Sequence, residues 1–517
     1  MPARYVTDLL DALRTHGDRT ALVSAGGAIG FTDLLADTYR TARALRRLGV
    51  RRADGLVLLA GNGPDALRVR LAGYLLGARF THVHLGPTTQ SVPHILADAD
   101  PTLVVTDDAG AVPGRALTTA RLAELAAAEP AGTLPVAADE DDIARITYTG
   151  GTTGLPKGVP TTYRALHAAA RSALAGAAAT RERLADRTGD ARFLAVTPIA
   201  HVAGDLALMM LSLGITVETY DFEPGAMLRS VAAGGVVLTY LYPALLGQLL
   251  DHPDLPTTDT SALSFVVYGS APMAPARLRA AIDAFGPIFQ QGYASTEAPA
   301  ITALTVADHV RGLADRPELL ASAGRPLPGV EVTVRDPAGR ALPPGEVGEV
   351  CVRSDSVMPG YWRRPAETAA VLADGWLHTG DLGRFDADGY LYLVGRAREM
   401  IIVGGWNCYA APIEAALTEH PSVRAAAVIG VPDEHTGAAI VAYLVADGDV
   451  DPADLRALVT ARLPEIAVPS RYEYLDALPL TPLGKPDKNA LRSAVPAAVC
   501  GAEDEREGEG EQPAERA

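Results

Sequence analysis

The chain has 517 residues, which exceeds what one hydrophobic core usually organises and is typical of two domains. Apolar residues make up 48% of it, enough to form substantial cores. Its net charge of −17 argues against nucleic acid or an anionic membrane as a main partner.

The N-terminal segment, the apolar runs and the cysteine spacing indicate the cellular compartment of the protein. The N-terminal segment lacks the apolar stretch of a signal peptide, and no apolar run reaches membrane-spanning length without interruption. Cys351, Cys408 and Cys500 are widely spaced and follow no disulfide or metal-ligand pattern. We therefore expect a soluble, reduced, cytoplasmic protein without inserted membrane segments.

In the first part of the chain, predicted strands alternate with predicted helices. Thr32 is placed to cap a helix that Gly49 ends, and a second helix is expected over 65–77. The expected strands cover 21–24, 55–61, 80–85 and 102–108. The alternation continues beyond residue 145, through VVLTYLYP (236–243) and LSFVVYGS (263–270). This order predicts parallel sheets covered by helices.

The pattern changes at about residue 330. Short alternating strands separated by Gly/Pro/Asp turns predict a small antiparallel β unit. After about residue 397 we expect a compact α+β pattern, with helices over 412–419 and 452–463 and strands over 423–430, 438–446 and 470–475. The predicted fold is therefore α/β, with a large domain over 1–397 and a small α+β domain over 398–497. Residues 498–517 are acidic and nearly devoid of apolar side chains, so we expect a disordered tail.

The chain has only three lysines, Lys157, Lys485 and Lys488, and the rest of its Lys/Arg set is arginine. Such a bias suggests that a retained lysine is needed as a compact, flexible ammonium group. Rarity alone does not distinguish that role from chance retention, so the position of each lysine has to decide.

The segment ITYTGGTTGLPKGVP (146–160) has the chemistry of a phosphate cradle. A buried strand runs into a Gly/Thr loop whose backbone N–H groups and hydroxyls can approach an anion, and Lys157 adds positive charge. It is not a Walker A loop, because Gly158 follows the lysine. The residues that we expect to bind phosphate here are Thr149, Gly150, Gly151, Thr152, Thr153, Gly154 and Lys157.

The motif TYTGGTTGLPKG resembles the phosphate loop of the adenylate-forming superfamily, which comprises acyl- and aryl-CoA synthetases, adenylation domains of peptide synthetases, and luciferases. Further motifs resemble the family's segments in the family's order over about residues 20–495. In TPIAHVAG (197–204), the resemblance places His201 beside the acid-binding pocket. It also implies that the small domain is mobile.

Two more segments resemble nucleotide-binding parts of that family. VVYGSAPM (266–273) resembles a turn that packs on adenine and the acid through Gly269, Ser270 and Ala271. QGYASTE (291–297) resembles the segment in which a tyrosine stacks near adenine, a threonine contacts phosphate and a glutamate holds Mg²⁺. The residues carried over are Gln291, Gly292, Tyr293, Ala294, Ser295, Thr296 and Glu297, with Thr149 as a second metal ligand.

The later motifs complete the series. Asp381 in LHTGDLG (377–383) resembles the ribose-binding carboxylate, and Arg396 matches an arginine near ribose and phosphate. Glu399 occupies the hinge position, where the family usually has Asp or Lys. In TPLGKPDKNALR (481–492), Lys485 resembles the catalytic lysine of the mobile domain, whereas Lys488 is expected to be a solvated residue at a helix start.

The resemblance implies an ATP- and Mg²⁺-dependent ligase that adenylates a small carboxylic acid, fatty or aryl, releases pyrophosphate and transfers the acyl group to CoA. Lys485, Lys157, His201 and Glu297 are its expected catalytic residues. A free amino acid is disfavoured, because His201 stands in the segment where amino-acid-activating domains carry an acidic residue.

The acceptor stays open at this point. The family commonly reads Gly-Gly-x-Asn-x-Tyr-Pro-x-Glu at its second-step loop, but here the text is GGWNCYAAPIE, with Trp406, Ala410 and Pro412 as departures. The alternatives are transfer to a carrier protein, activation of nitrite with transfer to an aromatic amine, and an inactive nucleotide-binding protein.

Overall fold

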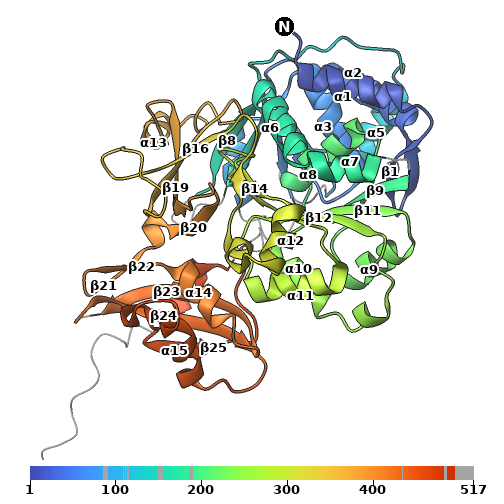
Figure 1. The fold of residues 1–517 in the computed structure, drawn as a ribbon. Helices are drawn as coiled ribbons and strands as arrows, with labels where there is room; N and C mark the ends of the chain where they lie inside the picture. The colour runs from blue at the N-terminus through green and yellow to red at the C-terminus, as the bar shows by residue number, and fades with distance from the viewer. Residues whose placement is uncertain are drawn as a thin grey trace, which may run out of the picture. The chain divides into compact units, whose positions relative to one another are not determined.

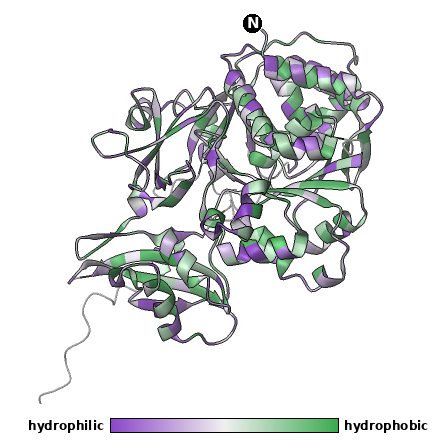
Figure 2. Ribbon diagram, in the orientation of Figure 1, coloured by the Kyte–Doolittle hydropathy of each residue, from purple (hydrophilic) through white to green (hydrophobic). Residues whose placement is uncertain are grey.

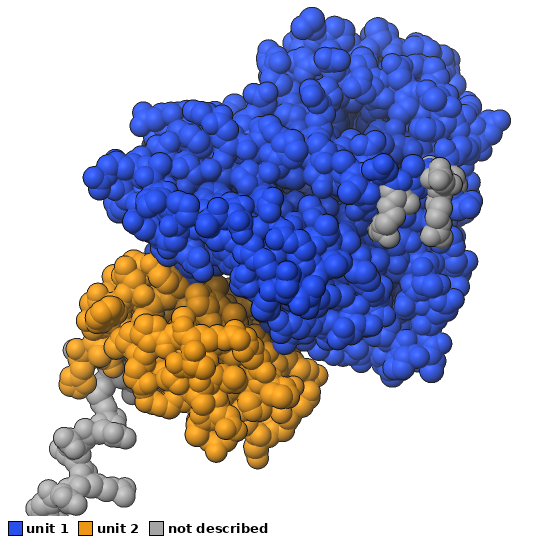
Figure 3. All heavy atoms as spheres, viewed as in Figure 1, with its two compact units in different colours: residues 1–398, 480–485 blue, residues 399–479, 486–517 orange. Residues whose placement is uncertain are grey.

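The computed structural model describes residues 1–84, 91–108, 110, 112, 116–149, 155–185, 190–433, 435–481 and 486–494. The chain divides into two compact units, residues 1–398 with 480–485 and residues 399–479 with 486–517 (Figure 3). Within the described part of the chain, no helix combines the length and the apolar character that a membrane crossing needs.

Unit 1 contains a six-stranded sheet in the order β6-β5-β3-β4-β7-β8 (Figure 1). All neighbours in it are parallel except β7 and β8, which form an antiparallel pair. The strands are β3 (Gly55–Leu59), β4 (Arg79–Val83), β5 (Leu103–Thr106), β6 (Ala116–Thr118), β7 (Ile143–Thr149) and β8 (Lys157–Thr162).

A nine-stranded sheet follows the order β15-β14-β13-β12-β11-β9-β10-β1-β2. Its central strands are parallel, and antiparallel strands close both edges. The strands are β1 (Thr20–Ser24), β2 (Gly27–Gly30), β9 (Ala191–Ala195), β10 (Thr216–Thr219), β11 (Val236–Leu241), β12 (Leu263–Gly269), β13 (Phe289–Tyr293), β14 (Thr302–Leu304) and β15 (Arg325–Pro326).

Helices pack on both faces of these sheets. Successive side chains of a strand point to opposite faces, so a buried strand contributes to a different core on each face. In β9, Phe193 lies in a core shared with helices from the first 76 residues and with the helix after His201, while Leu194 lies in a second core shared with the helices of residues 224–285. Figure 2 shows the central strands as largely hydrophobic and the covering helices as mixed. The helices of unit 1 are α1 (Arg4–Thr15), α2 (Phe31–Arg47), α3 (Pro64–Leu76), α4 (Val92–Ala99), α5 (Thr119–Ala127), α6 (Tyr163–Gly176), α7 (Ala178–Leu184), α8 (Val202–Ser212), α9 (Pro224–Ala232), α10 (Pro243–Leu250), α11 (Pro275–Phe285), α12 (Val306–Ala314) and α13 (Pro365–Val371).

A five-stranded antiparallel sheet completes unit 1, in the order β16-β17-β19-β18 with β20 also paired to β19. Its strands are β16 (Glu331–Arg335), β17 (Gly348–Arg353), β18 (Leu372–Ala373), β19 (Trp376–Phe385) and β20 (Leu391–Arg396). This sheet is the small antiparallel unit that the sequence predicts.

Unit 2 is a compact α+β unit. A sheet of β23 (Val423–Asp433), β24 (Gly437–Ala446) and β25 (Arg471–Tyr474) shares its core with α14 (Ala410–Leu417) and α15 (Pro452–Thr460). The hairpin of β21 (Ile401–Val403) and β22 (Trp406–Cys408) precedes them, and α16 (Lys488–Ala494) follows them. The predicted fold class, α/β with parallel sheets, an antiparallel β unit and a small C-terminal α+β unit, is confirmed.

The start of α2 differs from the prediction. Gly30, in an extended conformation, is the residue before the helix, and Thr32 lies inside its first turn. The Thr32 hydroxyl lies 3.4 Å from Asp18 Oδ1, while the Phe31 amide donates to the Arg19 carbonyl. The helix thus starts two residues earlier than a cap at Thr32 would place it, and the contact with Arg19, just before β1, accompanies this start.

Candidate active site

The predicted phosphate loop is framed by two paired strands. β7 ends at Thr149, which pairs in antiparallel register with Lys157, the first residue of β8. Gly150, Gly151, Thr152, Thr153 and Gly154 lie outside the described residues, as does Lys485. The Lys157 ammonium group lies 5.2 Å from the centre of the Tyr361 ring, a distance at which a cation and an aromatic face attract.

Tyr361 also contacts the predicted metal ligand. Its hydroxyl donates to Glu297 Oε1 at 2.9 Å, and the Met358 amide donates to the Glu297 carbonyl at 2.8 Å. Lys157 and Glu297, 140 residues apart in the sequence, therefore meet the same aromatic side chain. The sequence motifs missed Tyr361, although an aromatic pair (Tyr361–Trp362) after Pro-Gly is unusual in a chain with 5% aromatic residues.

Strands β12 and β13 approach each other very closely at the predicted adenine segment. Gly269 pairs with Gly292, and a Cβ at Gly269 would lie 2.5 Å from the Gly292 carbonyl oxygen. The next residue, Ser270, has a left-handed φ of 67°, and its hydroxyl lies 2.6 Å from the Tyr240 hydroxyl. The turn thus directs Ser270 and the half-buried Ala271 beyond the strand end.

The next segment offers polar groups at the same sheet edge. Ser295 and Ala298 form a tight turn, with Ser295 N donating to Ala298 O and Ala298 N donating to Ser295 Oγ. Ala294 is exposed and Thr296 is half-buried. Gln291 Oε1 is buried and has no hydrogen-bond partner among the described residues. A buried acceptor without a partner costs free energy, so a hydrogen bond from a ligand amino group to this oxygen would stabilise the bound ligand.

Three predicted nucleotide residues from separate segments form one hydrogen-bonded group. The Tyr293 hydroxyl donates to Asp381 Oδ2 at 2.7 Å, and Arg396 Nε lies 2.9 Å from Asp381 Oδ1. Asp381 is only 8% exposed, and its amide donates to Thr379 Oγ1. Burial, and then the Asp381 charge, raises the pKa of Tyr293 well above its ordinary value. The Arg396 guanidinium and a neutral phenol thus each orient one oxygen of the Asp381 side chain.

His201 directly precedes α8, whose first turn is packed against a neighbouring loop. A Cβ at Gly204 would lie 2.0 Å from the Ile199 carbonyl oxygen, so only glycine fits this approach. Burial, and then the nearby His84 and Arg145, lowers the pKa of His201 to about 4. The imidazole is therefore neutral at physiological pH and can serve as a polar but uncharged wall.

A buried ion network that the sequence did not reveal supports this segment. Asp205, in the first turn of α8, pairs with Arg145 of β7 and with Arg70 of α3. Burial of Asp205 opposes its ionisation, but the two arginines outweigh it and lower its pKa. The network joins the helix that follows His201 to the strand that leads into the phosphate loop.

Lys488 corrects a prediction, because it is not a solvated residue. It does begin α16, but its side chain is 16% exposed and lies 2.9 Å from Glu414 Oε1 and 3.7 Å from Glu399 Oε2. The partners come from α14 and from the predicted hinge position, so no local pattern around Lys488 predicts them.

The residues present are chemically suited to ATP and Mg²⁺. Glu297 and Thr149 offer carboxylate and hydroxyl oxygens, which Mg²⁺ prefers. Asp381 can accept hydrogen bonds from a diol, Gln291 has a buried acceptor without a partner among the described residues, and Lys157 supplies positive charge over the ring of the tyrosine that contacts Glu297.

Comparison with known proteins assigns the family. The model of the AMP-binding enzyme family matches residues 9–362, and that of the AMP-binding enzyme C-terminal domain matches residues 412–485. The chain is similar to the medium/long-chain-fatty-acid–CoA ligase FadD8 of Mycobacterium tuberculosis, with 34% identity over 94% of this chain and 89% of that protein. It is 36% identical to a feruloyl-CoA synthase of an Amycolatopsis species, over 92% of this chain and 95% of that protein.

Among solved structures, the amide bond synthetase McbA from Marinactinospora thermotolerans superposes with a TM-score of 0.82. The two are 36% identical, and the match covers 95% of this chain and 99% of that one. The chain therefore belongs to the AMP-binding, adenylate-forming enzyme family near its acyl-CoA ligase branch, and it is an enzyme of the acyl-CoA synthetase-like type.

Proposed function

We propose that this enzyme adenylates a small carboxylic acid, fatty or aryl, with ATP and then transfers the acyl group to CoA. The observation that carries the proposal is the convergence of Tyr293, Asp381 and Arg396 in one hydrogen-bonded group. That group suits a ribose, and Lys157 and Glu297, which share Tyr361, suit the phosphates and their metal ion. The matches to a fatty-acid CoA ligase and to a feruloyl-CoA synthase support both acid classes.

In the first step, a carboxylate oxygen of the acid attacks the α-phosphorus of ATP, and the bond to pyrophosphate breaks. Charge builds on the phosphate oxygens, so the enzyme contributes positioning and charge neutralisation. Asp381 and Arg396 would position the nucleotide, while Lys157 and Lys485 would neutralise charge. Mg²⁺, held by Glu297 and Thr149, would neutralise further charge on the phosphates when bound.

In the second step, the CoA thiolate attacks the acyl carbon, the bond to the phosphate oxygen breaks, and AMP leaves. We propose residues 1–397 as the large domain and residues 398–497 as a small domain that rotates between the steps, with the hinge at Glu399. This arrangement would let Lys485 serve adenylation and the hairpin of β21 and β22 serve transfer.

A specific observation favours an amine as a second candidate acceptor. The hairpin of β21 and β22 carries one of the departures from the family motif, Trp406, and has two exposed apolar side chains, Trp406 at 67% and Ile402 at 51%. The similarity to an amide bond synthetase extends over 95% of this chain. An amine nitrogen would attack the acyl carbon, AMP would leave, and the amine proton would pass to solvent.

One experiment tests both steps. ATP–pyrophosphate exchange is measured with fatty acids of several chain lengths, aryl acids and nitrite, and the best acid is then offered to CoA, to a carrier protein or to a primary amine. Acid-dependent exchange and a CoA thioester are expected. If an amide forms and no thioester does, the acceptor is an amine and not CoA. Nitrite-dependent AMP release would favour the nitrite-activating alternative. No exchange with any acid would contradict the proposal that the enzyme forms adenylates.

A further inference from the structure

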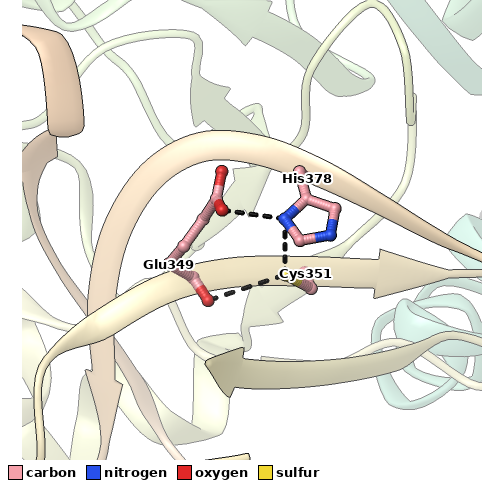
Figure 4. Close-up of side chains that lie close together, drawn as sticks. All are labelled: Glu349, Cys351 and His378. Carbon is pink, nitrogen blue, oxygen red and sulfur yellow. Dashed lines mark hydrogen bonds and ion pairs between the residues drawn. The ribbon is translucent and has the colours of Figure 1, made fainter. Parts of the chain in front are cut away.

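Three side chains of different ligand types meet on one face of the small antiparallel sheet (Figure 4). Glu349 and Cys351 are two residues apart on β17, so their side chains share a face. His378 lies on the neighbouring strand β19, in register with Cys351. The sequence gives no metal-ligand spacing, because one of the three side chains comes from another strand.

The distances match those between ligands of one small metal ion. Cys351 Sγ lies 3.5 Å from His378 Nδ1, His378 Nδ1 lies 2.8 Å from Glu349 Oε2, and one donor atom of each residue lies within 4.8 Å of the others. A tetrahedral zinc ion with bonds of roughly 2.0–2.3 Å holds its ligand atoms about 3.5 Å apart. Binding would therefore need only small side-chain movements.

Two of the three candidate ligands are partly exposed to solvent, and a backbone hydrogen bond fixes one of them. Cys351 is buried, but the side chains of His378 and Glu349 are 27% and 32% exposed. The other carboxylate oxygen, Glu349 Oε1, accepts a hydrogen bond from the Gly380 amide at 3.0 Å, which fixes the carboxylate. Such outer contacts orient metal ligands in known sites. Gly380, which contacts the cluster through Glu349, directly precedes the proposed ribose carboxylate Asp381 in the sequence.

We propose that Glu349, Cys351 and His378 bind a divalent cation of the zinc class, with water as the fourth ligand. A thiolate, an imidazole nitrogen and a carboxylate form a mixed donor set that zinc accepts and that Mg²⁺ and Ca²⁺ do not prefer. On binding, the thiol proton and the proton held between His378 and Glu349 pass to solvent. This site is separate from the Mg²⁺ ligands proposed above.

One neighbouring charge limits the affinity. Arg335 of β16 is in register with Glu349, and its guanidinium lies 4.5 Å from the centre of the Trp376 ring and donates to the Gly339 carbonyl. Burial, and then the Glu349 charge, raises the pKa of Cys351 to about 12; the Arg335 charge opposes that rise but also repels a cation. With three protein ligands and this arginine, we expect weaker binding than in a structural site with four protein ligands.

The test is a titration of the metal-free full-length enzyme with Co²⁺, which absorbs where Zn²⁺ is silent. A Cys500→Ser background leaves Cys351 and Cys408 as the only thiols. We expect one equivalent of Co²⁺ to bind with a sulfur-to-cobalt charge-transfer band, and Zn²⁺ to abolish that band by displacement. Cys351→Ser should remove the band, and the matched variant Cys408→Ser should keep it.

The other two ligands provide a readout that does not depend on removing the thiol. His378→Ala and Glu349→Gln should each weaken Co²⁺ binding by about tenfold or more. Circular dichroism and retained ATP–pyrophosphate exchange show that each variant is folded. No sulfur-to-cobalt band, a band that survives Cys351→Ser, or unchanged affinity in both other variants would show that the cluster is a hydrogen-bonded group only.

Discussion

At the residue scale, each carboxylate oxygen of Asp381 is bonded to a different neighbour, Tyr293 on one side and Arg396 on the other. The side chain is held rigidly before any nucleotide arrives, so a diol finds its acceptor already oriented. The carboxylate matters to this role, because a neutral amide has one oxygen acceptor in place of two and loses the ion pair with Arg396.

Asp381→Asn should therefore raise the KM for ATP by about tenfold or more, since a charge-assisted hydrogen bond is worth roughly 1.5–3 kcal/mol. Steady-state pyrophosphate exchange at varied ATP measures this. The matched control is Asp374→Asn, at an exposed position with φ of 52° that asparagine also adopts, and it should leave the KM unchanged. An unchanged KM in Asp381→Asn would remove the carboxylate from the nucleotide site.

Tyr361 joins Lys157 and Glu297 through different parts of one side chain, its ring and its hydroxyl. Tyr361→Phe keeps the ring but removes the donor to Glu297, so we expect kcat/KM to fall about tenfold with a changed Mg²⁺ dependence. In Tyr361→Leu, kcat/KM should fall further, because this variant also lacks the contact between the Lys157 ammonium group and the ring. Equal kinetics in Tyr361→Phe and wild type over a Mg²⁺ titration would contradict the assignment.

His201 makes a prediction about pH. Its pKa is lowered to about 4 in the folded protein, against about 6.5 when unfolded. Between these values the unfolded chain binds a proton that the folded protein does not, so the free energy of unfolding falls as pH falls from about 6.5 towards 4. The slope from this residue is at most about 1.4 kcal/mol per pH unit.

Denaturant unfolding of wild type and His201→Asn over pH 5–6.5 measures that slope. The variant should lose the part that His201 contributes, leaving the slope from other groups such as His82, whose pKa burial lowers to about 3. Identical slopes in the two proteins would show that His201 titrates normally in the folded state.

At the element scale, the close approach of β12 and β13 sets the shape of the proposed adenine segment. Gly269→Ala would place a Cβ 2.5 Å from the Gly292 carbonyl oxygen, and overpacking of this kind costs about 1–3 kcal/mol. We expect the thermal midpoint of unit 1 to fall. Gly292→Ala is the matched stability control, since nothing lies within 4 Å of its Cβ, and it should cost much less. Equal midpoints would contradict the strand spacing.

The elements were largely predictable because their signals are local. Continuous apolar runs such as 55–61 indicate strands buried on both faces, and the structure places β3 there. The predicted start of α2 was wrong by two residues, because the contact of Phe31 with Arg19, which lies outside the helix, is not visible in a local pattern. The order of strands within the nine-stranded sheet could not be predicted, because pairing between β1 and β10 joins segments almost two hundred residues apart.

In the candidate site, too, local motifs were predictable from the sequence, whereas contacts between distant segments were not. Tyr293, Asp381 and Arg396 lie in motifs that resemble those of the family, and these motifs mark the residues but not the contacts between them. Tyr361 was missed because its contacts to Glu297 and Lys157 cross more than sixty residues of sequence. Lys488 was interpreted wrongly because its partners lie on other elements.

At the scale of the whole molecule, the account requires two units to cooperate. The groups described in unit 1 suit the nucleotide and its metal ion, while Lys485, which the resemblance assigns to catalysis, lies in the small domain proposed above over 398–497. A lysine on a separate domain would neutralise charge only in the conformation that forms the adenylate, so its loss should affect the first step alone.

The most direct measurement of this claim is ATP–pyrophosphate exchange with the best acid, compared between wild type and Lys485→Ala. We predict acid-dependent exchange in wild type, and in the variant a loss on the order of 100-fold or more while a supplied acyl-adenylate is still converted. Lys157→Ala should reduce exchange less than Lys485→Ala does, because we expect the backbone N–H groups of the phosphate loop to remain as donors. Exchange near the wild-type rate in Lys485→Ala, or no acid-dependent exchange in wild type, would contradict the account.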